Sequence, residues 1–434
     1  MTSTTRPDTG LIRGIGRWGL TAFALNLTVG AGILGLPAKL QTLVGNYSFV
    51  VIMICGLLIA LIALCFAEIG SRFERTGGPQ LYASLAIGPT TGFTVGWLLW
   101  ISRLGTCAAV SNLLVDYGQV LEPALAGPAA RICTISLLVC GYMIVNIRGI
   151  RQTVAVNTVF TFVKLAPLFV FAGFGLFFVA PHSLHLGALP LTSDLSTAVL
   201  LAAFAFFGFD GTTVLAGEVR DPQRSVPFAI LLSVTIVIVL YTLIQIVCVG
   251  SLPNLAASER PLADAASAFA GPWAAIAVAV TAVIACAGVY GASVTPGTRL
   301  LFSMADHQQL PGTLARIHAR YHTPVVAILV TSIAALALAL SGSFIYLVKI
   351  TLIARVTIYA VTCVTLPLFR RRKDVPEAAV RIPGGSLIAW TCTLLCAAFL
   401  AKSSMRELLD VGLAVLLGLA ISGVTRRLLR SFAP

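Results

Sequence analysis

Residues 196–227 read STAVLLAAFAFFGFDGTTVLAGEVRDPQRSVP, and the interpretation of the whole chain depends on this stretch. It starts as an apolar run long enough to enter a bilayer, and Gly208, Asp210 and Gly211 interrupt the run halfway. A backbone N–H or C=O group that loses its helical hydrogen bond inside the bilayer costs free energy unless it lines a protein cavity or meets a ligand. A membrane helix broken beside an acidic residue therefore predicts a binding site. The simpler alternative is a glycine kink that serves helix packing.

A second interruption of the same kind lies in the first apolar segment of the chain. Residues 30–37 read GAGILGLP, so glycines and a proline break that segment. Paired interrupted segments in the two halves of a chain are typical of transporters that bind their substrate at the breaks. We therefore expect a transport site that both interrupted segments help to form.

The composition is that of an integral membrane protein. Of the 434 residues, 58% are hydrophobic and only 10% are charged, whereas charged residues make up about a quarter of a soluble domain. Apolar runs of roughly 20 residues recur along the chain, and each can cross a hydrocarbon core of about 30 Å as a helix. We count twelve such runs, at residues 18–40, 46–70, 91–115, 131–147, 155–179, 196–219, 228–250, 272–300, 324–341, 344–368, 386–402 and 407–425.

The connections between these runs are short, which predicts a single membrane domain at 18–425.

The positive charge is distributed for membrane insertion and not for nucleic-acid binding. The net charge is +13, but the basic residues fall in alternate loops. If the N-terminus is cytoplasmic, twenty of the 29 lysines and arginines lie in inner segments and five in outer segments, as the positive-inside rule requires. We therefore expect residues 1–17 and 426–434 in the cytoplasm, a cytoplasmic membrane location and no nucleic-acid partner.

Other classes of function find no support in the sequence. There is no GxxxxGK[ST] phosphate loop, so an ion gradient is the expected energy source for any pumping. The ten cysteines are dispersed through apolar segments and are expected to be buried thiols, and the five histidines show no ligand spacing. No nucleophile is paired with a base. We expect neither an enzyme, nor a metal site, nor a cofactor.

A few charged residues lie near the middle of the predicted spans. At about 1.5 Å of rise per helical residue, Arg103 and Lys164 lie about 18 and 13 Å from the cytoplasmic ends of their spans, and Arg355 lies about 16 Å deep. Asp210 is the acid at this depth. Arg103 and Arg355 either pair with Asp210 or recognise a substrate. The stem of Lys164 either reaches the inner headgroups or serves the site.

Together these motifs resemble the amino acid-polyamine-organocation superfamily of secondary transporters over nearly the whole chain. Residues 30–33 resemble the G-S-G-I motif of its first span, and residues 67–78 resemble its A-E-L…G-G pattern. Residues 204–227 resemble the stretch F-x-G-F-D…E-x-x-x-P-x-x-x-x-P, and residues 299–311 resemble R-x-x-x-x-M-A-R-D-G-x-L-P. The resemblance implies an all-α LeuT-type fold of twelve transmembrane helices. Inverted repeats would occupy 18–180 and 196–368, with broken first and sixth helices and accessory helices at 386–425.

The resemblance also implies where an amino acid binds. Backbone N–H groups at the first break would hold its carboxylate, in Ala31, Gly32 and Ile33. Carbonyl groups near the breaks would hold its ammonium, in Thr28, Phe204 and Phe207. Helix dipoles favour the same assignment, because an N-terminal helix end attracts an anion and a C-terminal end attracts a cation. Phe204 would also be the aromatic gate, and the third span would select the side chain through Ser102, Arg103 and Cys107.

The sequence thus predicts a proton-coupled L-amino acid permease. Lys164 matches a lysine that, in proton-coupled members, occupies the place of a sodium ion, and a buried lysine can carry a proton. The alternatives are an exchanger for an acidic or other polar amino acid, because three deep cations face one acid, and a passive channel. No run of pore-lining polar residues supports the channel. The expected partners are an amino acid, a proton and the lipid bilayer.

Overall fold

The computed structural model describes residues 11–30, 32–341, 344–401 and 403–431, and every regular element in these ranges is a helix. One isolated parallel bridge joins Ile15 to Val219. The longer helices are α1 (Arg17–Thr28), α2 (Gly32–Val44), α3 (Ser48–Gly70), α5 (Pro89–Leu121), α6 (Pro128–Arg148), α7 (Ile150–Gly175), α8 (Thr192–Ala205), α10 (Pro222–Ser251), α12 (Pro272–Asp306), α13 (Val325–Leu340), α14 (Phe344–Arg371), α15 (Gly385–Leu400) and α16 (Met405–Ser431). The shorter ones include α4 (Pro79–Ala86), α9 (Gly211–Val214) and α11 (Pro261–Ala270).

Eight helical stretches of the described chain are long and apolar enough to cross a membrane. The predicted all-helical membrane architecture is therefore confirmed. The count of twelve spans and the two inverted repeats stay predictions. The numbers differ because α2 and α3 follow each other almost without a break, while α8, α13 and α15 are apolar but only 14 to 16 residues long.

Proline fixes where several of these helices begin. It is the first residue of α5, α6 and α12, and glycine precedes it each time. Proline suits this position because the first N–H groups of a helix have no partner inside the helix, and proline lacks the N–H altogether. These helices begin within a few residues of the predicted spans. For example, α5 begins at residue 89, and its span was predicted to begin at 91.

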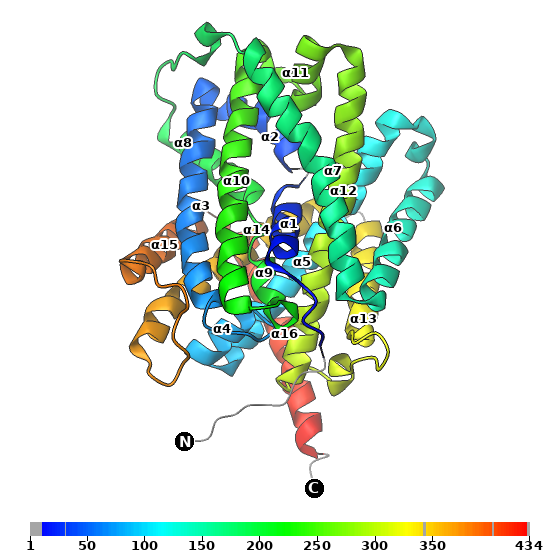
Figure 1. Cartoon of the computed structure of the whole chain (residues 1–434), viewed down its shortest axis with the longest axis vertical. Helices are drawn as coiled ribbons and strands as arrows, with labels where there is room; N and C mark the ends of the chain where they lie inside the picture. Colours follow the sequence, from blue (N-terminus) through cyan, green and yellow to red (C-terminus); the bar gives the residue numbers. More distant parts are fainter. Residues whose placement is uncertain (1–10, 31, 342–343, 402, 432–434) are drawn as a thin grey trace.

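Helix α1 lies in the middle of the bundle, with α10, α7 and α12 packed against it (Figure 1). Its residues from Leu20 to Thr28 are all buried. Helix α6 lies at the right edge of the view and α15 at the left edge, and α16 descends to the lower end (Figure 1). Because other helices surround α1, its end can face an internal cavity and not lipid, which makes a broken helix tolerable at this place.

The interruptions predicted from the sequence are present. Helix α1 ends at Thr28 and α2 begins at Gly32, while α8 ends at Ala205 and α9 begins at Gly211. Val29 is extended, with φ −78° and ψ 93°, and therefore ends α1. Ala31 lies outside the described residues.

Candidate functional site

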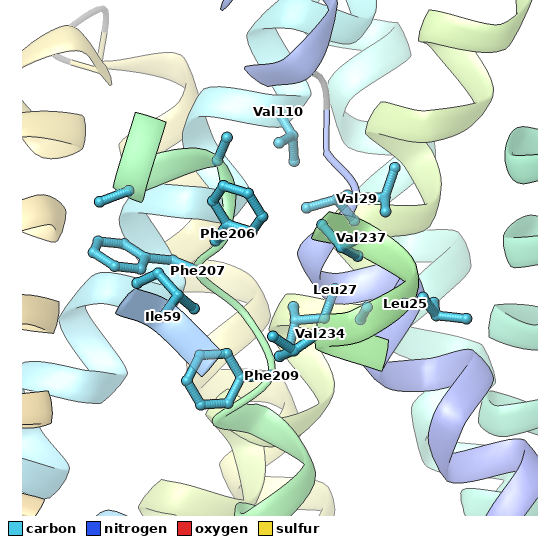
Figure 2. Close-up of a cluster of buried hydrophobic side chains, with 14 of the residues drawn as sticks. Leu25, Leu27, Val29, Ile59, Val110, Phe206, Phe207, Phe209, Val234 and Val237 are labelled. Carbon is cyan, nitrogen blue, oxygen red and sulfur yellow. The ribbon is translucent and has the colours of Figure 1, made fainter. Parts of the chain in front are cut away.

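The two breaks touch each other, and Gly208 is the residue that allows the contact. Its φ is +148°, and an added Cβ would lie 2.7 Å from the carbonyl oxygen of Leu27. Glycine alone tolerates both the backbone conformation and the approach. Figure 2 shows Phe206, Phe207 and Phe209 on the stretch between α8 and α9, and Leu27 on α1. The chain thus packs one break directly on the other.

A cavity of about 190 Å³ lies between the breaks. This volume is below the roughly 300 Å³ at which pockets for drug-sized ligands begin, so it suits one small molecule. The first break contributes Leu27, Thr28, Gly30, Gly32 and Ile33, and the second contributes Phe204, Ala205 and Phe207. The remaining wall comes from α5, α10, α12 and α14, through Thr106, Ala109, Val110, Leu113, Tyr241, Val289, Thr351 and Arg355.

Six residues singled out in the sequence line this cavity, namely Thr28, Gly32, Ile33, Phe204, Phe207 and Arg355. The three expected from the third span do not: Ser102, Arg103 and Cys107 are buried outside it. Thr106 takes the place expected for Ser102, four residues and one helical turn further along α5. Cys107 instead directs its sulfur toward the carbonyl oxygen of Tyr290 on α12, at 3.8 Å.

The start of α2 offers the cavity free backbone donors. Gly32 and Ile33 are the first two residues of this 13-residue helix, and N–H groups in the first turn of a helix have no partner within it. An added Cβ at Gly32 would meet nothing within 4 Å. On the opposite side of the break, the buried Thr28 hydroxyl has no hydrogen-bond partner in the described part of the chain. The cavity wall therefore holds polar groups that a bound ligand can satisfy.

Lys164 lies against the first break on its α1 side. It is fully buried on α7, and its Nζ donates hydrogen bonds to the carbonyl oxygens of Asn26, at 2.6 Å, and Val29, at 2.5 Å. No carboxylate in the described ranges forms an ion pair with it. The neighbouring Asn26 amide donates to Asn157 of α7, at 2.7 Å. The C-terminal end of α1, where carbonyl groups favour a cation, thus holds the lysine ammonium.

A second buried charge group is centred on Asp210, the last residue of the second break. Its carboxylate accepts hydrogen bonds from Arg103 Nη2, from Arg355 Nη1 at 3.2 Å and from the Tyr359 hydroxyl at 2.8 Å. Arg355 also donates from Nε to the Ser102 hydroxyl, at 2.9 Å. Two guanidinium groups share one carboxylate, so this group has an excess of one positive charge. Arg355 is the member that reaches the cavity wall.

An ion pair and backbone contacts connect the segment that follows the second break to α12 and to the segment that precedes α1. Glu218 receives two hydrogen bonds from Arg299 of α12, at 2.9 and 3.1 Å, and both side chains are buried. The backbone of Ile15, just before α1, accepts from Arg220 N–H and donates to the Glu218 carbonyl. These contacts link the chain at Glu218 to α12 and to the segment that precedes α1.

Sequence reasoning missed three polar groups of the site. Tyr359 lies four residues after Arg355 on α14 and therefore faces the same side of the helix, a spacing that could have indicated it. Thr106 follows Ser102 by the same interval. Tyr241 donates its hydroxyl proton to the carbonyl of Thr28, at 3.2 Å, and no sequence pattern points to it because the contact joins α10 to α1.

Comparison with known proteins adds independent information. A family model described as amino acid permease matches residues 15–407. The chain is 26% identical over 398 residues to the methylthioribose transporter of Bacillus subtilis strain 168, covering 86% of this chain and 84% of that protein. It is 24% identical over 414 residues to the branched-chain amino acid permease BcaP of the same bacterium, covering 90% and 88%. It is 28% identical over 387 residues to the mitochondrial cationic amino acid transporter 3 of Arabidopsis thaliana, covering 84% and 63%.

Proposed function

This chain belongs to the amino acid permease family, whose model matches residues 15–407, and from that premise we propose that it carries L-amino acids across the cytoplasmic membrane by alternating access. It is a multi-pass membrane protein, and its relatives are transporters. The observation that carries the proposal is the small cavity bounded by both helix breaks. Two helix ends of opposite polarity suit a zwitterion, because one end attracts its carboxylate and the other its ammonium.

The substrate carboxylate is assigned to the start of α2. Gly32 and Ile33 line the cavity and offer first-turn N–H groups. The space around Gly32 leaves room for the carboxylate oxygens. Ala31 completes this set by family resemblance. The Thr28 hydroxyl, which is buried and without a partner in the described chain, gains one when a polar ligand enters.

The substrate ammonium is assigned to carbonyl groups at the ends of α1 and α8. The Thr28 carbonyl accepts from Tyr241 at 3.2 Å, and the Phe204 carbonyl accepts from Phe207 N–H at 3.3 Å. A carbonyl oxygen has two lone pairs, so each retains one for an ammonium. The rings of Phe204 and Phe207 meet edge to face, with 6.3 Å between their centroids. Movement of Phe204 would open one side of the cavity, which is the role of a gate.

Lys164 is assigned to proton coupling. Its ammonium holds the carbonyl oxygens of Asn26 and Val29, and Val29 is the residue that ends α1. Hydrogen bonds from a charged donor are roughly twice as strong as those from a neutral donor. Loss of the proton therefore weakens the hold of α7 on the break and favours a different arrangement of α1. The proton cycle is in this way linked to the geometry of the substrate site.

Alternating access also requires the end of the bundle near Glu218 to open. The Glu218–Arg299 pair and the contacts of Ile15 are the connections that would break. The excess of basic residues in alternate loops supports a cytoplasmic location for this end and for both termini.

A ligand screen tests the proposed function. Purified protein is melted in the presence of each of the twenty amino acids, polyamines and methylthioribose. A ligand present at 100 times its Kd stabilises the folded state by about 2.7 kcal/mol, so a true substrate raises the melting temperature. Uptake of that ligand into proteoliposomes then establishes transport. A screen in which no amino acid raises the melting temperature, and none is taken up, would contradict the proposal.

A second candidate is an exchanger for an acidic amino acid. One observation favours it: the group around Asp210 carries an excess positive charge, and Arg355 brings that charge to the cavity wall. A substrate with a second carboxylate would be attracted there. Comparison of variants at Arg355 and Arg103 separates the two candidates.

A further inference from the structure

Three cysteines that are far apart in the sequence meet inside the bundle, outside the cavity described above. They are Cys65 of α3, Cys363 of α14 and Cys392 of α15, and each is fully buried. Their sulfur atoms all lie within 4.8 Å of one another. No spacing pattern connects these positions, and so the sequence predicted only dispersed, buried thiols.

The sulfur separations suit a single metal ion. A metal–thiolate bond is about 2.3 Å long, so three sulfurs in a plane around one ion lie about 4.0 Å apart. The observed upper limit of 4.8 Å is within 1 Å of that value. Each sulfur comes from a different helix, and α15 packs against both α3 and α14. Small rotations of the side chains would bring the three sulfurs to one ion.

The nearby charges compensate a metal–thiolate centre. Glu68 follows Cys65 by almost one turn on α3 and accepts two hydrogen bonds from Arg370, at 2.7 and 2.5 Å. Arg72 lies 3.5 Å from the same carboxylate, and its Nε is buried without a partner in the described chain. Two guanidinium groups and one carboxylate give one excess positive charge. Zn(II) with three thiolates carries one negative charge, which this group offsets fully. Cu(I) with three thiolates carries two negative charges, of which this group offsets one.

The donor set also selects the kind of ion. Thiolates favour soft ions such as Cu(I) and Zn(II), whereas Mg²⁺ and Ca²⁺ require oxygen ligands. The carboxylate of Glu68, almost one turn from Cys65 on α3, is already held by Arg370 and by the N–H of Ile382, at 2.9 Å. It is therefore not free to bind a hard ion.

We propose that Cys65, Cys363 and Cys392 bind one thiophilic ion, Cu(I) or Zn(II), and that this ion ties α15 to α3 and α14. Each thiol releases its proton to solvent as its sulfur binds the metal, and no group is oxidised or reduced. The site is separate from the substrate cavity, so this inference does not depend on which substrate the protein carries.

The test measures metal content and its dependence on the three cysteines. Full-length protein is produced in cells supplied with zinc and, separately, with copper, and is purified with its thiols reduced. Mass spectrometry counts the ions per chain. Protein stripped with a chelator is then titrated with Cd(II), and the ultraviolet thiolate-to-metal charge transfer reports sulfur ligation. Cys65→Ser, Cys363→Ser and Cys392→Ser are compared with Cys248→Ser, which alters a buried cysteine of α10 outside the group.

We expect about one ion per chain in the wild type and in Cys248→Ser, and occupancy at least about tenfold lower in each of the three other variants. Metal should raise the melting temperature of the first two proteins only. The supplement that fills the site, zinc or copper, identifies the ion. Cysteine alkylation followed by mass spectrometry of the wild type should show metal-dependent protection of these three thiols, even if a variant does not fold. Folded wild type that takes up neither ion nor Cd(II), or metal retained in all three variants, would overturn the proposal.

Discussion

The Nζ atom of Lys164 lies 2.5 Å from the carbonyl oxygen of Val29, the residue at which the first helix stops. A buried ammonium on α7 thus contacts the backbone of the break that lines the cavity. Because Val29 is extended and its carbonyl points to this donor, a change at Lys164 acts on the geometry of the substrate site. In the proposed function, this hydrogen bond links substrate binding to proton coupling.

Replacement of Gly32 by leucine tests the carboxylate site. The leucine side chain would enter the open space in front of the α2 N–H groups, so amino acid binding should be lost while the fold is retained. Gly35→Leu is the matched control, because an added Cβ at Gly35 also meets nothing within 4 Å but this residue does not line the cavity. Ligand-induced shifts in melting temperature measure the effect. Unchanged binding by Gly32→Leu would remove the first break from the site.

Thr28→Val tests the unpartnered hydroxyl in the cavity wall. Valine keeps the shape of threonine, so the change removes one hydrogen bond worth about 0.5–1.5 kcal/mol. Substrate affinity should fall about two- to tenfold, as measured by equilibrium binding. Thr158→Val is the control, since the Thr158 hydroxyl donates to the Val154 carbonyl of its own helix and Thr158 does not line the cavity. Equal affinities of the Thr28 variant and the wild type would show that the ligand does not use this group.

Arg355→Gln and Arg103→Gln separate substrate recognition from structural pairing. Both arginines contact Asp210, and only Arg355 lines the cavity. If the substrate is acidic, Arg355→Gln should weaken its binding by about 2–5 kcal/mol and leave neutral ligands unaffected. Arg103→Gln should lower the melting temperature without changing ligand preference. If Arg355→Gln instead weakens all ligands equally and lowers stability, the acidic-substrate candidate is excluded.

The distribution of basic residues predicts the orientation of the chain in the membrane. Reporter fusions after residues 40, 80, 150 and 375 should read outside, inside, inside and inside, because the inner segments hold twenty lysines and arginines and the outer ones five. A fusion at the C-terminus should also read inside. An outside C-terminal reporter would contradict the predicted twelve spans.

The sequence predicted the breaks well and the detailed cavity wall less well. Gly208 and Asp210 indicated the second break, because an acidic residue inside an apolar run is rare and usually belongs to a functional site. The rise per helical residue predicted Arg103, Arg355 and Asp210 at a similar depth in the membrane, and the structure brings their side chains together. The family resemblance indicated Ser102 for the cavity wall, whereas Thr106, one turn further along α5, lines it. A sequence motif identifies a helix but does not show which of its residues face the cavity. The cysteine group depends on the packing of three helices, which no local pattern contains.

The most direct test is uptake by Lys164→Ala in proteoliposomes, with a proton gradient, with a sodium gradient and with neither. Lys39→Ala, which changes an exposed lysine of α2, is the control. The wild type and the control should accumulate substrate only with the proton gradient. Lys164→Ala should lose this accumulation even where ligand binding persists. Sodium-driven uptake by the wild type, or full proton-driven uptake by Lys164→Ala, would contradict the assignment of coupling to Lys164.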